Sequence, residues 1–214
     1  MPTLYGAFGS PFVRKAIVAL TEKGIKFDHE QTNPFNSGPD YRKIHPLGKI
    51  PAFRDGDKTL PDSSVIIAYL ERTNPEPSLF PPDPYDYARA LWYEEFGDSG
   101  LAPIIGPKIF FAKVVAPRFL KREANLAEIQ KVVDTDLPPM FEYLEGEIGN
   151  KEWLVANRFS IADLGVATQF VNLKLAGYDV DAKRWPKLSA FINKVHSRPS
   201  FKSVIDREKA AFGL

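Results

Sequence analysis

Five prolines lie within the eleven residues from Asn74 to Pro84, at positions 75, 77, 81, 82 and 84. Proline fixes its own φ angle and lacks a backbone N–H, so a segment this rich in proline is stiff and interrupts helices and sheets. It is therefore the best domain boundary in the 214 residues. We predict a first domain over residues 1–73, a linker over residues 74–84 and a second domain over residues 85–214.

The first part of the chain alternates between short apolar strands and amphipathic helices. Ser10-Pro11 is typical of a helix N-cap followed by proline in the first turn, and Gly24 is typical of the residue that ends a helix. Asp55-Gly56-Asp57 is typical of a hairpin turn. We expect strands over residues 3–8, 26–31, 51–54 and 58–60, and helices over residues 11–23, around residue 41 and over residues 62–72. This order, β-α-β-α-β-β-α, predicts a thioredoxin-like layer.

Apolar residues recur at helical spacing through most of the second part. We expect Pro103 and Pro107 to interrupt its first long helix, and Pro138-Pro139 to kink a later one. The expected helices cover residues 85–111, 126–144, 160–175, 185–196 and 200–212. The two parts together predict an α/β plus all-α fold, with an N-terminal thioredoxin-like domain followed by an all-helical C-terminal domain.

Composition excludes several classes of function. The chain has 28 Lys and Arg against 27 Asp and Glu, and no basic half, which argues against nucleic acid or an anionic membrane as its partner. It has no cysteine, so disulfides, thiolate catalysis by the protein and cysteine-ligated metals are excluded. Its three histidines lack the spacing of metal ligands, and we expect no metal. Any sulfur chemistry must therefore use the sulfur of a ligand.

The sequence also indicates where the protein works. Its first residues lack the basic and apolar regions of a signal peptide. We expect no apolar stretch to approach the roughly 20 residues of a membrane span. We therefore expect a cytoplasmic protein.

Two short segments of the first part carry groups that suit a zwitterionic peptide. Gly48-Lys49-Ile50-Pro51 is a glycine turn that leads into a strand, and Asp62-Ser63 ends a strand and caps the next helix. The N–H groups at a helix N-terminus bind carboxylates, and the Asp62 carboxylate can face an amine. The plain alternative is a proline at the first position of a strand and an ordinary helix cap.

Ser10 presents a hydroxyl at a helix N-terminus, where the helix dipole and the free N–H groups favour an anion. A thiol with an ordinary pKa near 8.5 is mostly protonated at neutral pH. A hydrogen bond to the thiolate, together with the helix N-terminus, lowers such a pKa by about one or two units. Two alternatives stay open: Ser10 only caps the helix, or Tyr5 is the activating hydroxyl rather than a core residue. Arg14, one turn later, is expected to be exposed.

A third motif, Ser160-Ile161-Ala162-Asp163, is a variant of the capping box. Phe159 before it and Leu164 after it stand where a hydrophobic staple would place them. We assign this motif to the stability of its helix and not to a site.

These residues resemble the cytosolic glutathione transferase family, and the resemblance covers essentially the whole chain. The motifs that carry it are Gly48-Lys49-Ile50-Pro51, Asp62-Ser63 and the segment 159–164, while Ser10-Pro11 is similar to the serine-type classes. The resemblance implies that Ser10 is catalytic and that the Ile50–Pro51 bond is cis. The residues it implies for glutathione binding are Lys49, Ile50, Pro51, Asp62 and Ser63. Two positions depart from the family, because Asp62 stands where Glu or Gln is commoner and His45 where Asn is usual.

The resemblance also implies an activity. The glutathione thiolate would be conjugated to hydrophobic electrophiles, as in detoxification, or would reduce organic peroxides. No metal or redox cofactor is implied, glutathione is the co-substrate, and a homodimer is expected. The implied pocket for the hydrophobic co-substrate is lined by Phe8, Phe12, Leu101 and Ile105. Two other functions stay open: a non-catalytic binding or scaffold module of transferase-like fold, and a glutathione-dependent disulfide reductase.

Overall fold

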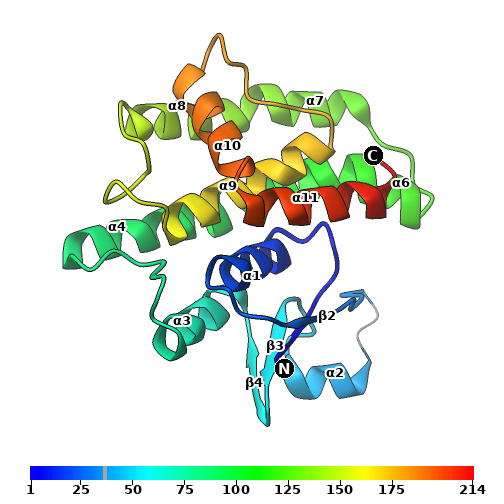
Figure 1. Cartoon of the computed structure of the whole chain (residues 1–214). Helices are drawn as coiled ribbons and strands as arrows, with labels where there is room; N and C mark the ends of the chain where they lie inside the picture. The colour runs from blue at the N-terminus through cyan, green and yellow to red at the C-terminus, as the bar shows by residue number, and fades with distance from the viewer. Residues whose placement is uncertain (36–37) are drawn as a thin grey trace. The chain divides into compact units, whose positions relative to one another are not determined.

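The computed structural model describes residues 1–35 and 38–214 (Figure 1). Its contacts divide the chain into two compact units. Unit 1 comprises Met1–Leu79 and Pro199–Leu214, and unit 2 comprises Phe80–Arg198. The last helix thus packs with the N-terminal part of the chain. The predicted linker over residues 74–84 and the domain boundaries on either side of it stay a prediction, because this division into compact units does not test them.

Unit 1 is built on a four-stranded mixed sheet with the strand order β2-β1-β3-β4. Strand β1 is parallel to β2 and antiparallel to β3, which is antiparallel to β4. The thioredoxin-like layer predicted from the sequence is confirmed. Its elements are β1 (Thr3–Tyr5), α1 (Pro11–Glu22), β2 (Asp28–Glu30), α2 (Pro39–Ile44), β3 (Ala52–Asp55), β4 (Lys58–Pro61), α3 (Ser63–Thr73) and the added helix α11 (Pro199–Phe212).

The register of the sheet gathers three loops at one end. Tyr5, the last residue of β1, lies opposite Ala52 at the start of β3, and Ala52 lies opposite Pro61 at the end of β4. The segments that follow β1, precede β3 and follow β4 therefore leave the sheet from the same end. These segments contain Ser10, the Ile50–Pro51 bond and Asp62-Ser63.

Helix α1 begins and ends where its sequence predicts. Ser10 is its N-cap, and Gly24 follows its C-cap with φ 66°, a conformation that favours glycine. Ala16 and Leu20 on its apolar face have no exposed surface, and Val13 and Ile17 are almost fully buried. Burial of this stripe against the sheet, rather than helix propensity alone, stabilises the helix.

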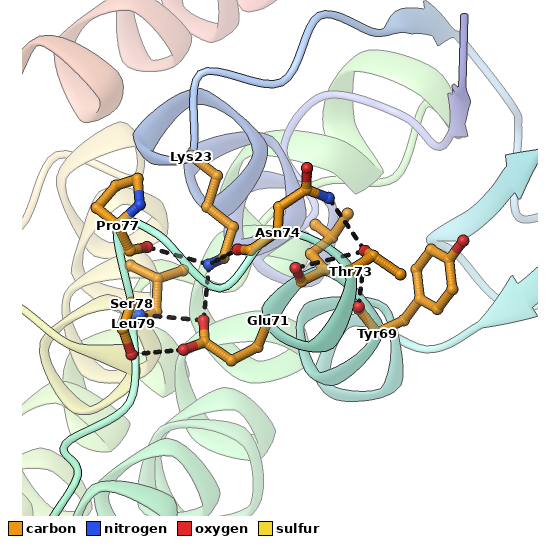
Figure 2. Close-up of polar contacts among 9 residues, drawn as sticks. Lys23, Tyr69, Glu71, Thr73, Asn74, Pro77, Ser78 and Leu79 are labelled. Atoms are coloured by element: carbon orange, nitrogen blue, oxygen red, sulfur yellow. Dashed lines mark hydrogen bonds and ion pairs between the residues drawn. The ribbon is translucent and has the colours of Figure 1, made fainter.

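The last turn of α1 holds the start of the proline-rich segment (Figure 2). The Lys23 ammonium forms an ion pair with Glu71 of α3 at 2.7 Å, and the Lys23 side chain has no exposed surface. The same ammonium donates to two backbone carbonyls of the segment, those of Asn74 at 2.7 Å and Pro77 at 3.0 Å. Glu71 in turn accepts hydrogen bonds from Ser78 and from the Leu79 N–H. Residues 74–79 are therefore tied to unit 1.

Unit 2 is helical. Its first helix runs without a break over Pro84–Phe119, and the predicted interruption at Pro103 and Pro107 does not occur. Wide π-type turns lie before Pro103 and around Pro107, and they accommodate the backbone hydrogen bonds that these prolines cannot donate. This helix consists of α4 (Pro84–Glu95), η1 (Phe96–Leu101), α5 (Ala102–Ile104), η2 (Ile105–Val115) and α6 (Ala116–Phe119).

The remaining helices of unit 2 are α7 (Leu126–Thr135), α8 (Leu137–Ile148), α9 (Ile161–Leu175) and α10 (Pro186–His196). Pro138-Pro139 lies in the first turn of α8, and Asp136 separates α8 from α7. The predicted kink is thus a break between two helices, since proline suits a first helical turn better than a helix interior.

The long helix Pro84–Phe119 bears on the question of a membrane. It is the one helix in the described residues whose length and composition would allow it to cross a membrane. The expectation that no stretch approaches this was wrong. Core helices of soluble proteins pass the same test, and Leu101, Ile105 and Ile109 of this helix have no exposed surface.

Candidate functional site

Ser10 lies at the junction between the β1 loop and helix α1. Gly9 before it has φ 85°, and Pro11 after it occupies the first helical turn. The half-buried Ser10 accepts a hydrogen bond from the Val13 N–H through its Oγ, at 3.3 Å. This bond uses the hydroxyl as an acceptor. The first turn of α1 contains no acidic residue, so no acid of that turn offsets the positive end of the helix dipole.

The second component of the site is the N-terminus of α3. Asp62 caps this helix with φ 74°, and its Oδ1 accepts from the N–H groups of Ser64 at 2.8 Å and Val65 at 3.3 Å. The cap uses one of the two carboxylate oxygens. The Asp62 N–H donates to the Pro51 carbonyl at 3.2 Å and so joins this helix to the Gly48–Pro51 segment.

Ser63 has an unusual environment for a hydroxyl. It has no exposed surface, and its Oγ finds no hydrogen-bond partner among the residues that the structure describes. Buried hydroxyls are nearly always paired, because burial without a partner costs about 1–3 kcal/mol. Ser63 is therefore a polar group at the site for which residues 1–35 and 38–214 supply no partner.

The third component is the turn before β3. The Ile50–Pro51 bond is cis, as the resemblance implied, and Gly48 has φ 65°. Lys49 is exposed, and its carbonyl accepts a hydrogen bond from the Tyr41 hydroxyl at 2.7 Å. Burial raises the pKa of Tyr41 to about 12, so this hydroxyl remains a donor. Helix α2 thereby fixes the turn that carries Ile50.

His45 is a further polar group near this turn, and the sequence marked it only as a departure from the family, in which Asn is usual at this position. It is buried, its ring stacks on Tyr41 at 6.4 Å, and its Nδ1 has no hydrogen-bond partner within the described part of the chain. Burial lowers the pKa of His45, the Asp62 carboxylate opposes this, and Lys49 adds to it. The sequence signal was its place three residues before Gly48.

Tyr5 fits the core interpretation. It is buried, and its ring lies 6.3 Å from that of Tyr41 and 5.5 Å from the Arg54 guanidinium. Arg14, expected to be exposed, has no exposed surface and pairs with Glu208 of α11 at 2.7 Å. A residue on the last helix could not be connected to Arg14 by any local pattern.

The four residues predicted for the hydrophobic co-substrate differ in exposure. Phe8 and Phe12 of unit 1 are half-buried, whereas Leu101 and Ile105 of unit 2 have no exposed surface. An apolar side chain without accessible surface reaches a ligand only if its surroundings move. No group of three or more His, Asp or Glu residues placed to hold a metal occurs in residues 1–35 and 38–214.

Family models match both parts of the chain. A model of the glutathione S-transferase N-terminal domain matches residues 4–78, and a model of the C-terminal domain matches residues 110–208. Together these two models span most of the chain.

Individual relatives cover nearly the whole chain at low identity. A glutathione S-transferase of Triticum aestivum is 26% identical over 97% of this chain and 94% of its own length. Glutathione S-transferase Z2 of Arabidopsis thaliana is 26% identical over 96% of this chain and 91% of its own.

Solved structures share the fold. A glutathione S-transferase from Rhodospirillum rubrum matches with a TM-score of 0.88 and 24% identity, over 95% of this chain and 91% of that one. A glutathione S-transferase from Methylobacterium radiotolerans, solved with glutathione sulfonate, matches with a TM-score of 0.76 and 27% identity, over 95% and 94%. Both halves of this chain thus match one family, and the chain belongs to the glutathione S-transferase family.

Proposed function

We propose that this protein is a glutathione transferase that conjugates the glutathione thiolate to hydrophobic electrophiles. The observation that carries the proposal is the meeting of three groups at one end of the unit 1 sheet: the Ser10 cap, the Ile50–Pro51 turn and the α3 N-terminus. Each of these offers polar groups of the kind that a charged peptide needs.

Each end of glutathione has a partner in this arrangement. The γ-glutamyl carboxylate binds at the α3 N-terminus, where the buried, unpartnered Ser63 hydroxyl becomes its donor once the residues around it make room. Asp62 faces the α-amine through the carboxylate oxygen that the helix cap does not use. The backbone of Ile50 pairs with the cysteinyl backbone, with Lys49 and Pro51 on either side.

Ser10 then holds the sulfur. Its hydroxyl accepts from the Val13 N–H and donates its own hydrogen to the thiolate, with the α1 N-terminus adding positive potential. The thiol proton leaves to solvent. The thiolate sulfur attacks an electrophilic carbon, a carbon–sulfur bond forms, and the leaving group departs with its electron pair. Positioning and a populated thiolate supply the rate gain.

The electrophile enters beside Phe8 and Phe12, the half-buried members of the predicted pocket. Reduction of an organic peroxide by the same thiolate is a second reaction for this site. A cytoplasmic homodimer, as is usual in the family, completes the proposal. Sedimentation of the purified protein tests the dimer.

Calorimetric titration with glutathione tests the binding site directly. Ser63→Ala should weaken binding by about 1–3 kcal/mol, because a hydrogen bond to a charged group is lost. Thr59→Ala, on the exposed part of strand β4, is the control and should bind as the parent does. The parent should also show thiolate absorbance when glutathione is bound at neutral pH, and it should turn over members of a panel of electrophiles.

Two results would contradict the proposal in different ways. Glutathione bound without thiolate absorbance or turnover would indicate a binding or scaffold module. Failure of the parent to bind glutathione would remove both that module and the transferase.

A further inference from the structure

A carboxylate from the last helix reaches the loop that carries Ser10. Glu208 of α11 accepts a hydrogen bond from the Gly9 N–H through Oε1 at 3.1 Å. Its Oε2 accepts from the Arg14 Nε at 2.7 Å and pairs with the Arg14 Nη2 at 2.7 Å. Neither side chain of the pair is exposed by more than 1%. One buried carboxylate thus serves both partners at once.

These two partners stand on either side of Ser10. Gly9 is the residue directly before it, and Arg14 is four residues after it in the first turns of α1. The Arg14 N–H also donates to the Ser10 carbonyl at 3.0 Å. The backbone of Ser10 is therefore fixed from the loop side and from the helix side by groups that both end at Glu208.

Helix α11 contacts α1 and the loop before it near both of its own ends. At its start, Ser200 donates a hydrogen bond to Glu22 at the end of α1, so the two helices run antiparallel. Near its end, the Arg207 guanidinium lies 4.9 Å from the Phe8 ring. The β1–α1 loop therefore contacts two successive residues of α11.

We propose that Glu208 is a positioning residue that sets the location of the Ser10 hydroxyl for the thiolate of bound glutathione. This inference rests on the proposed function. It adds a dependence on the C-terminal helix that neither the glutathione motifs nor the Ser10-Pro11 motif contains. A misplacement of about 1 Å in a catalytic group can cost about a hundredfold in rate, so a buried carboxylate that fixes the backbone on both sides of Ser10 affects turnover.

The variant Glu208→Gln distinguishes a positioning role of the carboxylate from a role in packing. A carboxylate accepts hydrogen bonds with both oxygens, whereas an amide has one acceptor and one donor group. In Glu208→Gln, either Gly9 or Arg14 must therefore lose its acceptor, although the volume of the side chain hardly changes.

The same variant also distinguishes positioning of Ser10 from a role that only balances the charge of Arg14. If Glu208 acted only by balancing the charge of Arg14, its neutralisation would leave a guanidinium unopposed near the site. The pKa of the bound thiol would then fall. If Glu208 positions Ser10, the thiolate loses its donor and the pKa of the bound thiol rises.

The experiment measures kcat, the KM for glutathione and the pKa of the bound thiol for Glu208→Gln. We expect kcat to fall at least fivefold, the KM for glutathione to stay within twofold, and the thiol pKa to rise. Glu71→Gln is the matched control, because it also neutralises an acid that pairs with a buried cation of α1, at the other end of the helix. It should lower the melting temperature and leave kcat and the thiol pKa unchanged.

A second variant covers the case in which Glu208→Gln does not fold. Glu208→Asp keeps the charge and both oxygens but is one methylene shorter. We expect it to lower kcat as well, whereas a charge-only role predicts parental kcat. Parental kcat and thiol pKa in whichever variant folds would overturn the proposal, and so would a fall in thiol pKa.

Amide hydrogen exchange distinguishes this inference from the proposed function. Exchange at Gly9 should accelerate in Glu208→Gln without any glutathione present. If Ser10→Ala leaves the thiol pKa of the parent unchanged, the proposed role of Ser10 fails. If Ser10→Ala raises it and Glu208→Gln does not, only the positioning role fails.

Discussion

Serine caps two helices of this chain, α1 and α9, in different surroundings. Ser160 at α9 has no exposed surface, accepts from the Ala162 N–H at 3.3 Å and donates to the Asp163 carboxylate at 3.2 Å. Asp163 also accepts from the Ser160 N–H at 2.8 Å, which completes the predicted capping box. Ser10 at α1 is half-buried, and the first turn of its helix holds no acid.

The difference shows what decides the role of a capping serine. At α9 the hydroxyl proton is already donated to a carboxylate, and that carboxylate also offsets the positive end of the helix dipole. At α1 the Ser10 hydroxyl is described only as an acceptor, and the carboxylate that reaches the loop before it, that of Glu208, is engaged by Arg14 and the Gly9 N–H. A serine at the N-cap can therefore either stabilise its helix or bind an anion. Which of the two it does depends on whether the residue three positions later is an acid that accepts its hydroxyl proton.

A pH titration of stability should separate the two caps most strongly. Burial raises the pKa of Asp163 from 3.8 to about 6, against the hydrogen bonds that it accepts. Between these values the folded chain keeps a proton that the unfolded chain releases. Stability from this group therefore falls as pH rises through the window, by at most about 3 kcal/mol.

Denaturant unfolding at several pH values measures this effect, with Asp163→Asn as the variant that cannot titrate. The parent should lose stability relative to Asp163→Asn as the pH rises from about 4 to about 6. An equal pH dependence of the two proteins would show that Asp163 is ionised normally.

Ser10→Ala tests whether the serine cap of α1 acts on the bound thiolate. Turnover at neutral pH should fall at least about tenfold, which corresponds to about 1.4 kcal/mol, because the thiolate loses its donor. The pKa of bound glutathione should rise, while glutathione affinity at low pH changes little. Absorbance titration of the thiolate measures the shift.

Tyr5→Phe is the control for this prediction. It should leave the thiol pKa and turnover as they are, since the Tyr5 ring packs against Tyr41 and Arg54. If Tyr5→Phe shifts the thiol pKa and Ser10→Ala does not, the tyrosine is the activating group.

Ser160→Ala should have the smallest effect, and that effect should be on stability alone. Loss of a serine cap costs about 1 kcal/mol of unfolding free energy. Turnover per folded molecule and the thiol pKa should not change. A normal melting curve combined with lost turnover would mean that the α9 cap had been assigned the wrong role.

Local patterns predicted much of this fold because their causes are local. Ser10-Pro11, Gly24 and Ser160 to Asp163 lie at the helix ends where capping rules put them. Pro103 and Pro107 did not follow the local rule, since π-type turns allow the long helix to continue past them.

The parts of the site that escaped prediction depend on distant contacts. Glu208 is 199 residues from Gly9, and no periodicity connects the two. His45 lies only a few residues from Lys49, but its burial and its unpartnered Nδ1 become visible only when α2 is placed beside the turn.

The contact between Glu208 and Gly9 has a consequence for the order in which the chain is made. A ribosome releases the N-terminal part of a protein first, and such parts commonly fold during synthesis. Here the sheet and α1 are made early, but α11 belongs to the same unit and is made only after unit 2. The loop before Ser10 therefore gains its contact with the Glu208 carboxylate only after all of unit 2 has been made, so a nascent chain that stops short of residue 208 carries the glutathione motifs without this support.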